Sequence, residues 1–405
     1  MPLSPAADSA RGVDDRVLDH EHDGSTGRRA GFDVPADLAY FNTANLAPLL
    51  RSVSEAGQQA LRSRGQPWAI SPQDWFTDVE TLRGQLGRLL GDTAEGVALV
   101  PSTSYGFAAV AGNLRAEPGD RVLVLAEEYP SGVYTWRRFA DRHDAEVVTV
   151  HRRGGRTWTE ALLDALDERT AVVSTPQVHW TDGAWIDLPA IAARAHEVGA
   201  ALVIDASQSL GAVPLDVGAL RPDAVVSVGY KWLLGPFGRS YLWLAPQHRA
   251  GRPVEENWIV RAGSEDFTRL VEYRDRYQPG ARRFDQGQRT LFELTPMAVA
   301  AVEQVLAWGV DAISAALGSV TDLIAQRLSP LGLHPDPHPR GPHMLGVQLP
   351  VRGRDRVLPA LAEARCFASI RGSSLRLAPH LHTTGEDIDR LVEALATAVR
   401  EDTDR

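Results

Sequence analysis

From residue 97 onward, short runs rich in β-branched and aliphatic residues alternate with stretches of helical periodicity. The predicted strands are Val97–Val100, Arg121–Leu125, Glu146–Val150, Ala171–Ser174, Ala201–Ile204 and Ala224–Val228, with Ser240–Leu244 as a further strand. The helices between them are predicted at 104–114, 132–143, 159–167 and 188–198. The run 201–204 lacks polar alternation, as expected of a strand covered on both faces. This rhythm predicts an α/β fold around a mostly parallel, seven-stranded sheet.

The segments on either side of this rhythm predict the domain organisation. Residues 1–30 contain many Asp, Gly and Arg and few large apolar side chains, which favours a disordered or loosely attached tail. We assign 31–55 to a segment joining a small domain, 56–290 to a large domain and 291–405 to a smaller α+β domain. Further helices are predicted at 51–64, 76–91, 292–307, 309–328 and 385–400, and further strands at Met344–Leu349, Phe367–Ile370 and Leu375–Leu377.

Composition narrows the classes of partner and compartment. The formal net charge is −10, so the chain has no basic surplus to neutralise nucleic-acid phosphates. It has no apolar run of the ~20 residues that cross a bilayer, and no basic stretch followed by an apolar core at its N-terminus. A single cysteine cannot form an intramolecular disulfide and fits a reducing compartment. We therefore expect a cytoplasmic protein without nucleic-acid or membrane partners. No histidine spacing is typical of zinc, so no metal site is predicted.

One residue stands out from the basic composition. Of the 42 basic residues, 41 are arginines and the only lysine is Lys231. A guanidinium can replace an ammonium in ion pairs and phosphate contacts, but it cannot lose its proton at workable pH and attack a carbonyl. An arginine bias explains the arginines but not the exception. Lys231 therefore points to amine chemistry, although a leftover lysine is an alternative reading.

Polar residues gather where the predicted strands end, which is where open α/β sheets bind ligands. Lys231 follows the strand 224–228 in Val228-Gly229-Tyr230-Lys231-Trp232, and Asp205 ends the strand before it, with Gln208 three residues later. A lone Asp at a strand end is most often a helix cap, but its pairing with Lys231 favours a functional role.

Three further groups are predicted near the same edge. Pro101-Ser102-Thr103-Ser104-Tyr105-Gly106 links a strand to a helix, and free N–H groups with hydroxyls at a helix start bind anions, although helix capping alone also explains them. Tyr129 follows the next strand, where an aromatic side chain is more often part of a core. Arg376 alternates with leucines on a short strand, and its planar fork suits a carboxylate. Amine, acid, anion cup, aromatic face and carboxylate clamp are the groups that pyridoxal 5'-phosphate (PLP) requires from a protein.

The sequence also resembles a known family. ALVIDASQSLGAVPLDV followed by DAVVSVGYKWLLGPFG is similar to the signature of class V aminotransferases, a group that contains isopenicillin N epimerase-like proteins, cysteine desulfurases and kynureninases. Tyr40-Phe41-Asn42-Thr43-Ala44-Asn45 and Leu375-Arg376-Leu377-Ala378-Pro379 resemble motifs at the two ends of that family, so the resemblance runs from about residue 38 to 398. It implies PLP fold type I, with a large domain and a smaller C-terminal one, and a homodimer with shared active sites.

The resemblance implies roles for residues at matching positions. Lys231 would form the imine with the cofactor and move protons, Asp205 would pair with the pyridine nitrogen and Gln208 with the phenolic oxygen. Ser102, Thr103 and Tyr230 would bind the phosphate, together with Gly287 and Gln288 from the other subunit. Tyr129 would stack on the ring, and His179 and Trp180 would lie beside the cofactor. Arg376 would bind the substrate carboxylate with Asn45.

The reaction is less constrained than the cofactor. A cysteine desulfurase needs a mobile thiol, and the only candidate, Cys366, is predicted within a strand. A kynureninase would be expected to carry Asp where Gly132 stands and His where Gln208 stands. We favour lysis of a C–S bond, or a transamination-type deamination, in an amino acid or amino-acid conjugate of specialised metabolism. Epimerisation, desulfuration, kynureninase-like hydrolysis and a PLP-binding regulatory module stay open. The Arg-rich stretch 252–290 suits either an anionic substrate or a solvated dimer edge.

Overall fold

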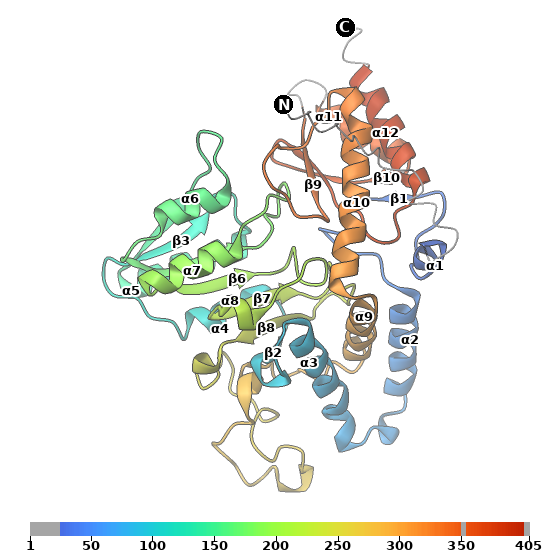
Figure 1. The fold of residues 1–405 in the computed structure, drawn as a ribbon. Coiled ribbons are helices and arrows are strands. Elements are labelled where there is room, and N and C mark those ends of the chain that lie inside the picture. The colour runs from blue at the N-terminus through green and yellow to red at the C-terminus, as the bar shows by residue number, and fades with distance from the viewer. Residues whose placement is uncertain (1–24, 350–353, 401–405) are drawn as a thin grey trace, which may run out of the picture.

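A computed structural model describes residues 25–349 and 354–400 and contains a large and a smaller part (Figure 1). A seven-stranded sheet lies at the centre of the large part, in the order β2-β8-β7-β6-β5-β3-β4. Its strands are β2 (Val97–Val100), β3 (Arg121–Leu125), β4 (Glu146–Val150), β5 (Thr170–Pro176), β6 (Ala201–Asp205), β7 (Ala224–Val228) and β8 (Ser240–Leu244). β8 runs antiparallel to both neighbours, and the other pairs are parallel. The predicted α/β fold with a mostly parallel sheet is confirmed.

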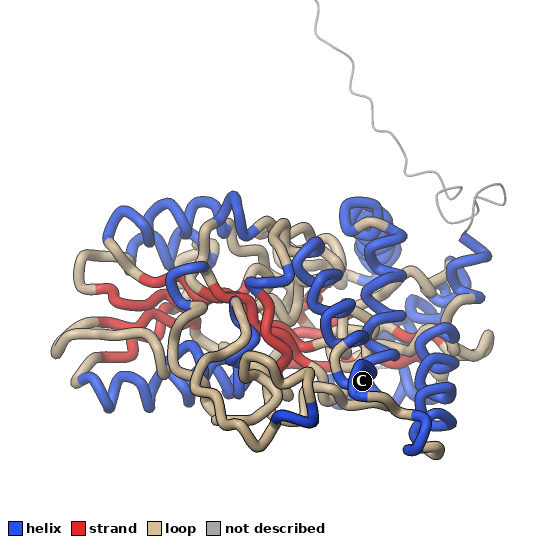
Figure 2. Tube along the Cα trace, turned by 90° about the horizontal axis from the view of Figure 1, so that it is seen from below, coloured by secondary structure: helices blue, strands red, loops and turns tan. Residues whose placement is uncertain are grey.

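Helices cover both faces of this sheet, as Figure 2 shows from below. Successive strand residues point to opposite faces, so Val122 and Val124 pack with α4 (Thr103–Ala111) and α5 (Pro130–His143) on one side. Leu123 and Leu125 belong to a second core on the other side, with residues of α3 (Thr77–Leu89), α6 (Trp158–Ala165), α7 (Leu188–Val198), α8 (Val217–Leu220) and α9 (Leu294–Trp308). Burial on both faces explains the missing polar alternation in the strand sequences.

The smaller part follows the long helix α10 (Val310–Leu328). Its antiparallel sheet has the order β11-β12-β9, from β9 (Leu345–Gln348), β11 (Ser369–Arg371) and β12 (Ser374–Leu377), and α11 (Arg354–Glu363) and α12 (Gly385–Arg400) pack together with it. The predicted strand Phe367–Ile370 is interrupted: β10 (Cys366–Phe367) pairs with β1 (Ala39–Tyr40), and β11 pairs with β12. The two short strands use different partners, and no period in the sequence marks the change.

The N-terminal segment connects the two parts. Residues 1–24 of the expected tail lie outside the described residues, and Ser25–Ala30 form helix α1, whose Arg29 pairs with Asp387 at 2.5 Å. Farther along, Asn42 forms a β-bridge with Ala378 of the smaller part. The Ala47 N–H donates to the Tyr230 carbonyl of the large part at 3.0 Å, just ahead of helix α2 (Arg51–Arg64). The segment therefore reaches the loop that carries Lys231.

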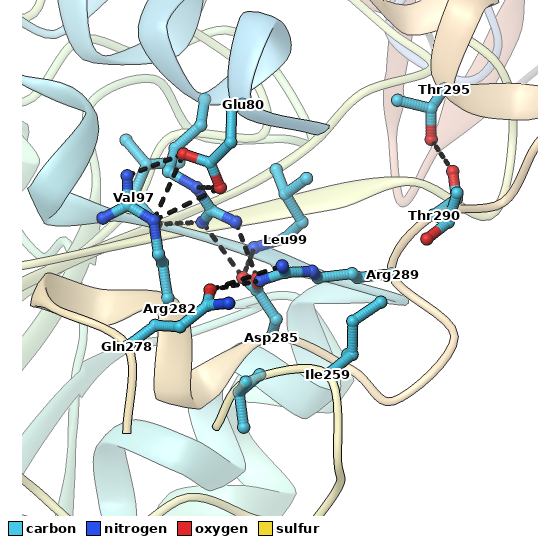
Figure 3. A network of polar contacts seen from close by, with 12 residues as sticks. Glu80, Val97, Leu99, Ile259, Gln278, Arg282, Asp285, Arg289, Thr290 and Thr295 are labelled. Carbon is cyan, nitrogen blue, oxygen red and sulfur yellow. Dashed lines mark hydrogen bonds and ion pairs between the residues drawn. The ribbon is translucent and has the colours of Figure 1, made fainter. Parts of the chain in front are cut away.

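A buried ion network fixes the segment after the short 3-10 helix Gly280–Phe284 to the sheet (Figure 3). The Asp285 carboxylate pairs with Arg83 at 2.6 Å and with Arg289 at 2.7 Å, and it accepts the Leu99 N–H at 2.7 Å. The Asp285, Arg83 and Arg289 side chains are all 0% exposed. Glu80 of α3 extends the network by pairing with Arg83. Strand β2, helix α3 and residues 285–289 are thereby held together.

No single helix in the described ranges is long and apolar enough to span a membrane. Two consecutive segments, Leu294–Trp308 and Val310–Leu331, meet the length and composition criteria only together, and they are bent by 77°.

Candidate active site

A cavity opens at the carboxyl ends of β6 and β7 and the start of α4. Its walls come from strand ends and the loops that follow them, the arrangement expected of an open α/β sheet. Eight of the predicted site residues line it: Ser102, Thr103, Tyr129, Trp180, Asp205, Gln208, Tyr230 and Lys231. Residues that the sequence did not single out also line it, among them Glu128, Ser207, Phe237, Gly238 and Ser240.

Lys231 lies in a tight loop between β7 and β8. The Gly229 N–H donates to the Arg239 carbonyl at 2.9 Å, and a Cβ at Gly229 would lie 2.8 Å from that oxygen, so only glycine allows this approach. The Lys231 Nζ lies 5.8 Å from the centre of the Tyr129 ring and 6.0 Å from that of Tyr230. Within 25–349 and 354–400, no hydrogen bond or ion pair engages this ammonium. The amine is therefore held between two aromatic rings and left available.

The electrostatics of the cavity favour a reactive amine. Burial lowers the pKa of Lys231 to about 8; Asp205 opposes this effect, while Arg376 and Arg371 add to it. Burial raises the pKa of Asp205, although its Oδ1 accepts the Ser207 N–H at 2.9 Å. Burial, together with Asp205, also raises the pKa of Glu128 to about 8. The cavity thus offers one amine whose pKa is lowered toward neutrality and two carboxyl groups whose pKa values are raised.

This pKa predicts how the cofactor-free protein reacts with an aldehyde. Only the neutral amine attacks a carbonyl, so the rate of PLP capture should rise about tenfold per pH unit below the pKa and level off above about pH 8. Asp205 favours the charged amine, so Asp205→Asn should move the midpoint to lower pH. Stopped-flow absorbance at a series of pH values measures both effects. A midpoint near 10.5 in the unmodified chain would contradict this environment for Lys231.

The anion cup is built by the start of α4. Ser102 is the N-cap of this nine-residue helix, and its Oγ accepts the Tyr105 N–H at 3.2 Å. Pro101, Ser102, Thr103 and Ser104 all line the cavity. The first N–H groups of a helix have no partner within the helix and carry its positive end. A phosphate placed here needs no basic side chain.

Gln208 has a fixed amide orientation. Its Oε1 accepts the indole N–H of Trp232 at 3.0 Å, and its Nε2 donates to the Ala44 carbonyl at 3.0 Å. The indole can only donate, so the amide nitrogen must take the opposite side. One N–H of that nitrogen stays available for an acceptor. The neighbour of Lys231 and the N-terminal segment therefore set the orientation of the amide.

Arg376 belongs to β12 and lies behind Trp180. It is 1% exposed, and its Nη1 donates to the Trp180 carbonyl at 2.7 Å, while its buried Nε and Nη2 find no partner among the described residues. Burial, with nearby Arg371, lowers the pKa of Arg376 to about 9. Asn45, which was predicted to help bind the carboxylate, is exposed and does not line the cavity. The nearby Asn42 has a buried Oδ1 that, like the Arg376 nitrogens, lacks a hydrogen-bond partner in the described chain. Unsatisfied guanidinium N–H groups are suited to a carboxylate ligand.

Three other predicted residues, His179, Gly287 and Gln288, do not line the cavity. His179 is buried behind it, with Nδ1 bound to Thr181 and Nε2 bound to the Ala126 carbonyl, so its ring is not free for a ligand. Its neighbour Trp180 does line the cavity. Gly287 and Gln288 lie outside the lining, and Gln288 is exposed. Such exposure is compatible with contact to a second subunit.

Cys366 is remote from this chemistry. It is 1% exposed in β10, and burial raises the pKa of its thiol to about 12. A thiol in this environment is not ionised at neutral pH.

An available amine, an adjacent acid and a helix start facing one cavity define a PLP-type site on an α/β sheet. Comparison with known proteins agrees. Residues 40–364 match the family model described as Aminotransferase class-V. A kynureninase of Deinococcus radiodurans is 30% identical over 283 residues, covering 67% of this chain and 66% of that protein. An isopenicillin N epimerase of Streptomyces clavuligerus is 28% identical over 382 residues, covering 87% and 93%. A solved structure of the cystine C-S lyase C-DES superposes with a TM-score of 0.80 at 19% identity, covering 89% and 98%.

The chain belongs to the class V aminotransferase family. It is a PLP-dependent enzyme of fold type I that acts on amino acids, as its sequence predicted. The residues of the cavity fit the cofactor, because a free amine and a helix start for the phosphate are both present. The buried guanidinium of Arg376, with unsatisfied N–H groups, is bound to the backbone of Trp180 in the cavity wall. Among the described residues, no group of three or more His, Cys, Asp or Glu side chains is placed to hold a metal ion.

Proposed function

We propose that Lys231 is the residue that binds PLP covalently and that Asp205 holds the ring nitrogen protonated. In this arrangement Ser102, Thr103 and Tyr230 bind the phosphate, Tyr129 covers the ring and Gln208 donates its free N–H to the phenolic oxygen. The observation that carries the proposal is the placement of the single lysine, unpaired and with a pKa of about 8, in the same cavity as Asp205 and the start of α4.

When bound, PLP supplies an electron sink for cleavage at the substrate Cα or Cβ. The side chains of the chain would do the rest. Arg376 orients the substrate by its carboxylate through Nε and Nη2. Lys231 and Glu128 both have pKa values near 8, so each can hold or release a proton close to neutral pH. Trp180 and Tyr129 pack edge to face, with ring centres 5.6 Å apart, and together form one wall of the cavity.

The reaction we propose is lysis of a C–S bond in an amino acid or amino-acid conjugate. A thioether R–S–CH₂–CH(NH₃⁺)–COO⁻ and water would give the thiol R–SH, pyruvate and ammonium, and no protein thiol is needed. This agrees with the burial of Cys366, which argues against a desulfurase.

The test of the reaction is a panel of S-substituted cysteines and other amino acids, supplied without a keto acid. Release of pyruvate and ammonia from the cysteine conjugates is the expected result. Formation of a 2-keto acid that keeps its sulfur, only when a keto-acid acceptor is added, would replace lysis by transamination. Inversion of the α-carbon without either product would indicate an epimerase.

Removing the guanidinium of Arg376 should weaken substrate binding but leave the cofactor in place. We expect Arg376→Ala to raise KM for amino-acid substrates about 10²-fold, because a charge-assisted, bidentate contact to the carboxylate is lost. The absorption of bound PLP should persist, since no predicted cofactor contact is removed. Steady-state kinetics and a visible spectrum measure the two effects. An unchanged KM would reject this role for Arg376.

We also propose a homodimer in which Gly287 and Gln288 of one subunit approach the phosphate site of the other. The exposure of Gln288 supports this arrangement, and Asp285 anchors the segment from inside its own subunit. Sedimentation equilibrium should give twice the mass of the chain. A monomer with full activity would exclude a shared site.

A further inference from the structure

A second arginine stands beside Arg376 on the hairpin formed by β11 and β12. The register pairs Arg371 with Ser374 and Ser369 with Arg376. Directly opposed residues of an antiparallel pair share a face, and so do residues two apart on one strand. Arg371 and Arg376 are therefore diagonal neighbours on the same face, at a backbone separation of about 7–8 Å. Gly372, with φ of +57°, closes the turn between the strands.

Trp180 links this face to the cavity, because it contacts both guanidinium groups. Its carbonyl accepts the Nη1 hydrogen bond of Arg376 at 2.7 Å, and its indole ring lies 5.9 Å from the Arg371 Cζ. The indole itself lines the cavity and packs against Tyr129, and its N–H donates to the Glu127 carbonyl at 2.6 Å. The Arg371 guanidinium therefore lies over a ring that lines the cavity, although Arg371 does not line the cavity itself.

Neither guanidinium is neutralised by a protein acid. In the ranges that the structure describes, Arg371 and Arg376 form no ion pair, and the Arg371 Nη1 donates only to the adjacent Ile370 carbonyl at 2.9 Å. Other arginines do form ion pairs with protein acids. Arg83, Arg152 and Arg249, for example, each pair with an aspartate. Two like charges on one face repel each other, and Arg371 contributes to the lowered pKa of Arg376. An anionic ligand that meets both groups would relieve this repulsion.

We propose that Arg371 binds a second anionic group of the substrate, so that the substrate class is an amino acid or cysteine conjugate whose side chain ends in a carboxylate. The inference rests on the proposed function, in which Arg376 takes the α-carboxylate. A guanidinium that lies over an indole ring keeps its planar fork open toward a carboxylate. Arg371 is then a specificity-determining residue, and the distance between the two arginines selects the length of the substrate side chain.

The experiment uses the PLP-loaded full-length protein and two probes that differ in one group. S-Carboxymethyl-L-cysteine carries a second carboxylate, and S-carbamoylmethyl-L-cysteine carries a neutral amide of the same size. Their dissociation constants are read from the change in the absorption of bound PLP, and pyruvate release is measured in parallel. The unmodified protein should bind the carboxylate at least about tenfold more tightly, the effect of one charge-assisted hydrogen-bond pair.

Three variants test whether Arg371 causes the preference for the carboxylate probe. Arg371→Gln should bring the ratio of the two constants close to one, and Arg371→Lys should restore part of it. Arg365→Gln, which removes an exposed arginine paired with Asp37, should leave the ratio as it was. Equal binding of the two probes by the unmodified protein, including no detectable binding of either, overturns the inference, and so does a preference that survives Arg371→Gln. Tighter binding of the carboxylate probe without pyruvate release from either probe would instead contradict the proposed C–S lysis and still support the anion site.

Discussion

Lys231→Ala is expected to abolish covalent retention of PLP and to lower turnover by at least about 10³-fold. The chain has no other lysine, so no neighbouring amine can take over the attack on the aldehyde. The proton transfers assigned to this amine are lost as well, and such transfers contribute about 10²–10⁴-fold in other enzymes. The visible absorption of the purified protein and its steady-state rate measure the two losses.

Two control variants distinguish the loss of the amine from the loss of the positive charge and from a general effect of substitution. Lys231→Arg keeps a cation in the cavity but cannot form the bond, so it should resemble Lys231→Ala. Arg138→Lys places an ordinary lysine on the exposed surface of α5 and should change neither the spectrum nor the rate. Activity retained in Lys231→Arg would show that a positive charge, rather than an amine, is what the site needs.

Asp285→Asn is expected to lower the free energy of unfolding by about 3–5 kcal/mol. The amide keeps the shape of the carboxylate but leaves Arg83 and Arg289 buried without their common counter-charge (Figure 3). Burial opposes ionisation of Asp285, but Arg83 and Arg289 outweigh it and hold the pKa of Asp285 below its usual value. Its stabilising contribution is therefore present above the ordinary pKa of an aspartate, near 4, and is lost as the pH falls through the lower folded value. Urea unfolding at pH 7 measures the change.

Glu80 supplies the control because it belongs to the same network but is partly exposed. Glu80 pairs with Arg83 at 3.1 Å and with Arg282 at 2.6 Å, and its side chain is 37% exposed. Solvent screens these pairs, so Glu80→Gln should cost about 1 kcal/mol or less. A cost for Asp285→Asn no larger than that for Glu80→Gln would contradict the view that the buried carboxylate anchors residues 285–289.

The large domain could be predicted closely because its strands are buried on both faces. All seven predicted strands form, and the end of each predicted run lies within two residues of the observed end. The hydrophobic runs leave one solution: a sheet covered by helices on each side. The smaller domain was less predictable. Its strands are two to four residues long, and the division at Ala368 depends on which distant strand each half meets.

The residues of the candidate site also divide into those that could be predicted from the sequence and those that could not. Lys231, Asp205 and the start of α4 could be found because the carboxyl ends of parallel strands meet at one edge. Glu128 was missed, although it precedes the predicted Tyr129, because only burial reveals its raised pKa. Arg371 was missed because its relation to Arg376 depends on the register of a hairpin. The place of His179 behind the cavity depends on its packing against Trp158, which no local pattern shows.

The most direct test of the central claim uses the single lysine itself. Borohydride reduction of the PLP-loaded protein fixes the cofactor to the amine that holds it, and peptide mass spectrometry then locates the label. The label should lie on the peptide that contains Lys231, in amounts equal to the protein chain. A label confined to the α-amino terminus, or a protein that leaves reduction unlabelled, would contradict the assignment of this amine.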